Sequence, residues 1–183
     1  MARTRLVKTT PALLLSLVLI SACGWHLRGT LALPEGLDTV YLNDQAGAEV
    51  LSRTMEELLT ANQVKVATGH SNAQLVINIL DYREDRRVVS IGGNTLVTEY
   101  ELIARAIYSL EDGQGNVLLP SAEASVIRSY EFDENNVLGK AEEERLIQQE
   151  MRRELAQQII RRLRFMDLDS AQALANHHKL AKH

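Results

Sequence analysis

An alternation of side chains that runs without a break from Thr98 to Leu110 constrains the fold of this chain more than any other feature. One face of the segment carries Tyr100, Leu102, Ala104, Ala106, Tyr108 and Leu110, and the other carries Glu99, Glu101, Ile103, Arg105, Ile107 and Ser109. Alternation over this length predicts a long strand with one buried face. Turn-forming residues flank it at 92–94 (Gly-Gly-Asn) and 112–116 (Asp-Gly-Gln-Gly-Asn). They predict a tight hairpin at each end and therefore an antiparallel meander.

Apolar and β-branched runs elsewhere supply the neighbours of this strand. Further strands are predicted at 39–42, 64–68, 75–80, 88–91 and 117–130. The charged stretch 81–87 lies between two of them. Pro120 is expected near a strand end or a bulge, because proline cannot donate to a ladder.

Two segments have the helical spacing of apolar residues. A helix is predicted over 48–61, where the stripe is Leu51, Met55, Leu58 and Leu59, with Asn62 as its left-handed cap. A longer helix is predicted over 140–165, where the stripe is Ile147, Met151, Leu155, Ile159 and Leu163. The glutamates at 142–144 open this helix and Arg161, Arg162 and Arg164 close it, which complements the helix dipole. The predicted fold class is α+β: a two-layer sandwich of about four mostly antiparallel strands with two helices packed on one face.

The first 22 residues have the layout of a secretory signal. Arg3, Arg5 and Lys8 precede an apolar stretch at 11–20 that is too short for a comfortable membrane-spanning helix. We therefore predict a cleaved signal peptide at 1–22, one α+β domain at 23–166, and a polar tail at 167–183 that is expected to be disordered. Cleavage removes three cations and no acid, so the formal net charge changes from −4 to −7. An excess of acid argues against a nucleic-acid binder.

Cys23 is the single cysteine of the chain, and three roles are open to it. It is a buried packing residue, a catalytic thiol or an attachment point. Its position at the end of the signal disfavours burial, and a new N-terminus is a poor scaffold for a catalytic group. No hydrolase, metalloprotease or nucleotide-binding motif occurs in the sequence, and no His, Cys and carboxylate spacing suggests a metal site. A binding or assembly role without enzyme activity is favoured.

Residues 19–23, Leu-Ile-Ser-Ala-Cys, resemble the lipobox of bacterial lipoproteins. The resemblance implies a diacylglycerol thioether and an N-acyl chain on Cys23, which would be the only cofactor-like group. Several acyl chains make a stable membrane anchor. Gly24 after the cysteine is similar to the signal for sorting to the outer membrane.

The mature sequence resembles the LptE family of lipopolysaccharide-assembly lipoproteins. The resemblance rests on Cys-Gly-Trp-His-Leu-Arg at 23–28, Thr-Glu-Tyr at 98–100, Arg-Ser-Tyr at 128–130 with Phe132, and Gly-Lys at 139–140. It implies a non-enzymatic, lipid-anchored subunit that faces the periplasm or the lumen of an LptD-type β-barrel. There it would form a heterodimer with that barrel, act as its plug, assist its assembly and help deliver lipopolysaccharide. The alternative is a stand-alone lipoprotein that binds a small ligand or acts as an envelope enzyme.

The family resemblance also implies direct lipopolysaccharide binding through basic residues at a hairpin tip and before the last helix. Lys140 matches the second position. At the first, this chain has Ile-Gly-Gly at 91–93 where the family pattern has an arginine, and Arg86 and Arg87 are the nearest candidates. Lipid A phosphates attract such cations, arginine in bidentate geometry.

Overall fold

Three long strands form the centre of the sheet and set the length of the domain. The computed structural model describes residues 33–34, 36–93 and 97–164. Within them, one five-stranded sheet has the order β2-β1-β3-β4-β5. Its strands are β1 (Thr39–Asp44), β2 (Lys65–Val66), β3 (Leu75–Ile91), β4 (Val97–Asp112) and β5 (Val117–Glu131). The β3–β4 and β4–β5 pairs are antiparallel, as predicted, whereas β1 pairs in parallel with both β2 and β3.

The predicted strands at 75–80 and 88–91 are two parts of one strand, and the charged stretch 81–87 between them belongs to it. β3 continues through it as one strand, with a bulge at Leu80 between the pairs Ile79–Tyr108 and Asp81–Ile107. Beyond the bulge, the residues on the helix-facing side of β3 are Tyr82, Glu84, Arg86 and Val88, each opposite an inward residue of β4. The strand persists there because cross-strand hydrogen bonds and polar partners replace apolar burial.

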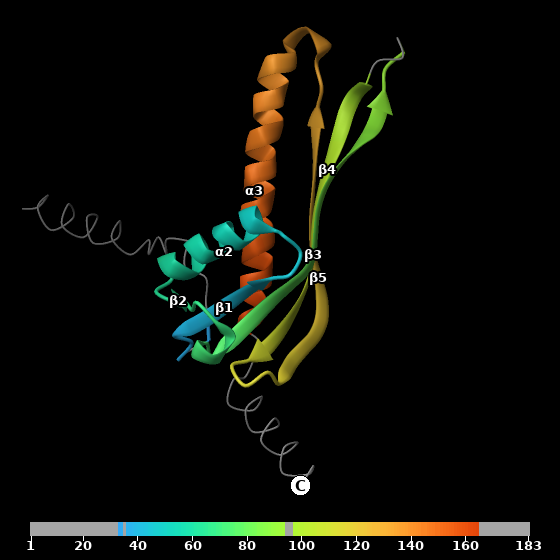
Figure 1. Cartoon of the computed structure of the whole chain (residues 1–183). Coiled ribbons are helices and arrows are strands. Elements are labelled where there is room, and N and C mark those ends of the chain that lie inside the picture. The colour runs from blue at the N-terminus through green and yellow to red at the C-terminus, as the bar shows by residue number, and fades with distance from the viewer. Residues whose placement is uncertain (1–32, 35, 94–96, 165–183) are drawn as a thin grey trace, which may run out of the picture. The chain divides into compact units, whose positions relative to one another are not determined.

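Both helices cover the same face of the sheet (Figure 1). α2 (Glu49–Ala61) lies over the β1 side, and α3 (Val137–Leu163) runs alongside β4 and β5. The helix stripes are buried as predicted, apart from the partly buried Ile147: Leu51, Met55, Leu58, Leu59, Met151, Leu155, Ile159 and Leu163. Each such side chain contributes roughly 1.5–3 kcal/mol by leaving water. The predicted α+β class is confirmed, with five strands in place of about four. No helix among the described residues is both long and apolar enough to span a membrane.

The ends of the helices differ from the predictions. α3 begins at Val137, because the Asn136 side chain accepts a hydrogen bond from the Gly139 N–H at 3.3 Å and caps the first turn. The glutamates at 142–144 therefore lie beyond the first turn, and the prediction that they complement the dipole is wrong. At the end of α2, Asn62 has φ −99° and the left-handed residue is Gln63, with φ 66°.

A carboxylate organises the turn between β4 and β5. Asp112 accepts hydrogen bonds from the N–H groups of Gln114 and Asn116, both at 2.8 Å, and from the Asn116 side chain at 2.7 Å. Burial acts to raise the pKa of Asp112, and these hydrogen bonds outweigh it, so the pKa is lowered. Two short 3₁₀ turns, η1 (His70–Asn72) and η2 (Glu134–Asn136), complete the described chain.

Candidate anion-binding site

Two of the predicted site residues come together at one end of the sheet, which we call the hairpin end. Here β3 leads to β4, β5 ends and α3 begins. Arg86 lies on the helix-facing side of β3, and its Nη1 contacts Glu144 Oε2 of α3 at 3.0 Å. Lys140 precedes Glu144 by one helical turn, and residues four apart share one side of a helix. The structure therefore places Arg86 and Lys140 beside the same side of α3.

The other predicted residues lie elsewhere. Arg87 follows Arg86 and so projects from the face of the sheet opposite α2 and α3, where its Nε contacts Glu101 Oε1 at 2.6 Å. Cys23, the predicted signal peptide at 1–22 and the predicted tail at 167–183 lie outside the described residues, so their roles stay predictions.

Aromatic rings hold Arg86 in position. Its guanidinium lies 4.6 Å from the centre of the Tyr100 ring, within the range of a cation–π contact. Tyr100 stacks on Tyr130, with ring centres 5.8 Å apart, and forms a T-shaped pair with Phe132, with ring centres 5.4 Å apart. These three rings all belong to the later phrases on which the family resemblance rests, at 98–100, 128–130 and 132, and the fold brings them into one group.

Glu144 joins this aromatic group to α3. The Tyr130 hydroxyl donates a hydrogen bond to Glu144 Oε2 at 2.5 Å, and Gln148 Nε2 donates to Glu144 Oε1 at 3.2 Å. Burial, followed by the Glu144 carboxylate, raises the pKa of Tyr130 to about 12. We call this group the Arg86 cluster: Arg86, Tyr100, Tyr130, Phe132, Glu144 and Gln148.

Lys140 has its own carboxylate, and exposed aliphatic residues lie near it in the sequence. Its Nζ contacts Glu143 Oε2 at 2.8 Å, and its side chain is only 19% exposed. Close to it in the chain, Val137 and Leu138 are 52% and 88% exposed, and Val88, opposite Tyr100 on the sheet, is 47% exposed. Val88 follows Arg86 on the same side of β3, and Val137 precedes Lys140 by about one turn of α3, so each cation has an exposed aliphatic neighbour on its own element, an arrangement that suits an anionic amphiphile.

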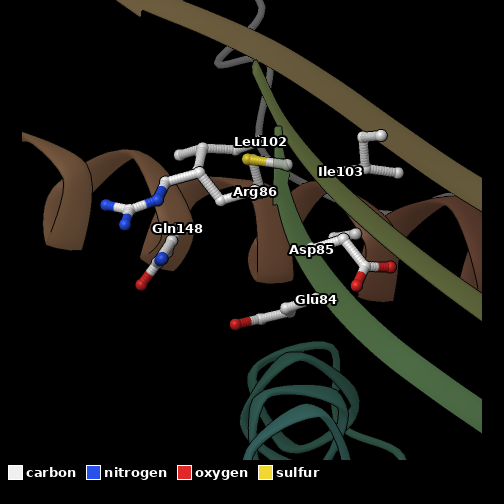
Figure 2. A pocket seen from close by; sticks show the side chains of 8 residues that line it. Glu84, Asp85, Arg86, Leu102, Ile103 and Gln148 are labelled. Atoms are coloured by element: carbon white, nitrogen blue, oxygen red, sulfur yellow. The ribbon is translucent and has the colours of Figure 1, made fainter. Parts of the chain in front are cut away.

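A second polar contact between β3 and α3 lies farther from the hairpin end than the Arg86 cluster. Arg152 Nη1 is 3.0 Å from both carboxylate oxygens of Glu84, which also accepts a hydrogen bond from Tyr82. Burial, together with Glu84, raises the pKa of Tyr82. Arg86 and Gln148 lie on one side of β3, and Asp85 on the other (Figure 2).

The small space beside these contacts is a cavity of about 70 Å³, lined by Glu84, Asp85, Arg86, Leu102, Ile103, Ala104, Gln148 and Met151. A cavity of this size admits a few water molecules but no organic substrate. The described part of the chain contains no group of three metal-ligating side chains.

Sequence reasoning found the two cations but missed their partners. Glu144 lies one helical turn after Lys140, which is the signal in the sequence, but a helix predicted to start at residue 140 places Glu144 near its N-terminus, whereas α3 begins at Val137. Tyr130 and Tyr100 are paired across β4 and β5, so their approach follows from the strand register. That register was not available from the alternation alone.

Comparison with known proteins agrees with this arrangement of elements. The family model LptE, described as lipopolysaccharide-assembly, matches residues 37–163. The LPS-assembly lipoprotein LptE of Pectobacterium atrosepticum is 28% identical over 168 residues, covering 88% of this chain and 86% of that protein. The LptE of Yersinia enterocolitica is 30% identical over 155 residues, covering 81% and 72%.

Solved structures of lipoproteins share the fold. Lipoprotein B from Nitrosomonas europaea has a TM-score of 0.66 and 26% identity, over 77% of this chain and 90% of that one. A minor lipoprotein from Acinetobacter baumannii has a TM-score of 0.58 and 28% identity, over 71% and 92%. Because the family model covers most of the described residues, this chain belongs to the LptE lipopolysaccharide-assembly family.

Proposed function

We propose that this protein is an outer-membrane lipoprotein that acts as a plug in an LptD-type β-barrel, assists assembly of that barrel and helps deliver lipopolysaccharide to the cell surface. Membership of the LptE family supports the proposal, as do relatives named LPS-assembly lipoproteins. In this proposal the protein is not an enzyme, and its only attached group is the lipid on Cys23.

The lipid on Cys23 holds the domain at the inner surface of the outer membrane, facing the periplasm or the barrel lumen. Metabolic labelling with palmitate tests this anchor: the wild-type chain should be labelled and Cys23→Ser should not. Continued labelling of Cys23→Ser would place the lipid on another residue.

Direct contact with lipopolysaccharide is proposed at Arg86 and Lys140. The observation that carries it is the position of both cations beside one side of α3, each with an exposed aliphatic neighbour on its own element. Phosphates of lipid A would contact the cations, with bidentate geometry at Arg86, while acyl chains would cover the aliphatic side chains.

Binding of detergent-dispersed lipopolysaccharide to the purified mature lipoprotein tests the contact. Arg86→Gln and Lys140→Gln should each weaken binding about tenfold, the loss expected for one charge-assisted contact. Arg145→Gln is the matched control, because Arg145 lies on the same helix and contacts Glu142 at 2.6 Å. Unchanged affinity in the first two variants would remove them as contacts. Arg87→Gln in the same assay tests the remaining predicted residue.

The plug role is tested separately by co-purification. Extraction of outer membranes in mild detergent should recover the protein in a stable one-to-one complex with a large β-barrel. Recovery of the protein as a monomer would contradict the plug role, whatever its affinity for lipopolysaccharide.

A further inference from the structure

We infer that Glu143 and Glu144 are built-in competitors for the anion at this site, so that they set the affinity of Arg86 and Lys140 for phosphate. The inference rests on the proposed lipopolysaccharide contact and concerns its regulation. Its starting observation is that each cation is already paired, Arg86 with Glu144 at 3.0 Å and Lys140 with Glu143 at 2.8 Å. A phosphate must therefore replace a carboxylate at each position.

The Arg86–Glu144 pair is open enough to exchange. The Arg86 side chain is 50% exposed, and ion pairs with an exposed partner contribute little to stability because water screens them. A phosphate carries more charge than a carboxylate and offers more acceptor oxygens to a guanidinium. A phosphate can therefore replace the Glu144 carboxylate as the acceptor for Arg86.

Neither partner is left without contacts after the exchange. Glu144, whose side chain is only 17% exposed, keeps the hydroxyl of Tyr130 at 2.5 Å and the amide of Gln148 at 3.2 Å. Arg86 keeps its position over the Tyr100 ring. A buried carboxylate without donors would resist release of its cation, and Glu144 avoids that penalty.

Glu144 thus stays charged and close to the incoming phosphate, and like charges at short range repel. The same applies to Glu143, which is 46% exposed and better screened. Both carboxylates lower the affinity for any bound anion, and Glu144 has the larger effect. Such a site favours a ligand that satisfies both cations at once over a ligand with a single charge.

Binding of detergent-dispersed lipopolysaccharide to the purified mature lipoprotein tests the inference. Glu144→Gln keeps an acceptor for Tyr130 and should tighten binding roughly threefold to tenfold. Glu143→Gln should tighten binding less. Because Glu143 is exposed, this substitution should leave the fold intact. Glu142→Gln is the matched control: it removes the same charge from the same helix, but its carboxylate contacts Arg145 and neither site cation. Its affinity should equal that of the wild type.

Two further measurements connect the effect to Arg86 and to phosphate. In the Arg86→Gln background, Glu144→Gln should tighten binding clearly less than it does in the wild type, because the competition for Arg86 is gone and only the repulsion between Glu144 and the phosphate remains. With dephosphorylated lipopolysaccharide, Glu144→Gln should bind like the wild type.

Unchanged or weaker binding by Glu144→Gln overturns the inference, and so does equal tightening by Glu142→Gln or tightening toward the dephosphorylated probe. Measurable wild-type binding with no gain in Glu144→Gln rejects the competition alone and leaves the proposed function intact. Absence of binding in the wild type and in every variant rejects the lipid contact and the competition together.

Discussion

A single methyl group at Gly113 tests the packing of the sheet directly. Gly113 follows β4 and lies against the chain that enters β3, and its N–H donates a hydrogen bond to the Gln74 carbonyl at 3.2 Å. A Cβ at this position would lie 1.9 Å from the carbonyl oxygen of Ala73 and 3.1 Å from its carbonyl carbon. The obstacle is backbone, so no side-chain rotation relieves the clash.

The cost of Gly113→Ala follows from this geometry. The Cβ-to-oxygen distance must grow from 1.9 Å to beyond 3.0 Å, which separates the end of β4 from the start of β3 by about 1 Å. Overpacking of this kind lowers the free energy of unfolding by about 1–3 kcal/mol, and loss of the hydrogen bond lowers it by about 1 kcal/mol. Alanine also restricts the unfolded chain, which offsets about 0.4–1 kcal/mol of this loss. The free energy of unfolding should fall by about 2–3 kcal/mol.

Urea denaturation of the mature protein, followed by far-ultraviolet circular dichroism, measures this change. Gly69→Ala is the matched control, because Gly69 has an extended backbone with φ −167° and no atom within 4 Å of an added Cβ. It should change the free energy of unfolding by less than about 0.5 kcal/mol. Equal stability of the two variants would refute the close approach of Gly113 to Ala73.

Three other predictions concern the core and two titrating groups. Leu155 is fully buried, so Leu155→Ala should lower the free energy of unfolding by about 2–5 kcal/mol in the same assay. Leu138→Ala, at a side chain that is 88% exposed, is its control and should change little. The turn hydrogen bonds outweigh burial and lower the pKa of Asp112, so the stability they add is present above its ordinary pKa and is lost as pH falls. Asp112→Asn should be less stable at neutral pH and lose less stability on acidification. Burial and Glu144 raise the pKa of Tyr130 to about 12, so stability from this group is complete below pH 10 and is lost as pH rises toward 12. Glu144→Gln should lower the pKa of Tyr130 in an ultraviolet titration, and an unchanged pKa would contradict the hydrogen bond.

The elements of the fold were predictable where apolar periodicity decides them. The alternation at 98–110 forms most of β4, and the stripe from Met151 to Leu163 is the buried side of α3. Apolar periodicity does not predict a strand at 81–87, because both faces of β3 carry charged residues there. A strand forms there because Glu84 and Arg86 find partners on α3, far away in sequence. Tertiary contacts of this kind leave no local signal.

The candidate site was predictable in its cations but not in its geometry. Lys140 followed from the family resemblance, and Arg86 and Arg87 were equivalent in the sequence. The bulge at Leu80 shifts the phase of β3 by one residue, which places Arg86 toward α3 and Arg87 on the opposite face. Neither propensity nor spacing predicts a bulge at a leucine in an apolar run.

The two halves of β3 are held by different forces, and this difference bears on how the site works. Before the bulge, the helix-facing residues Leu75, Ile77 and Ile79 are fully buried, and each contributes roughly 1.5–3 kcal/mol. Beyond it, Glu84 and Arg86 face α3 through partly exposed ion pairs, which contribute about 0–1 kcal/mol each. A ligand that replaces one of these pairs therefore removes only a small part of the stability of the domain. The proposed exchange of a carboxylate for a phosphate at the hairpin end would therefore leave the core half of the sheet folded.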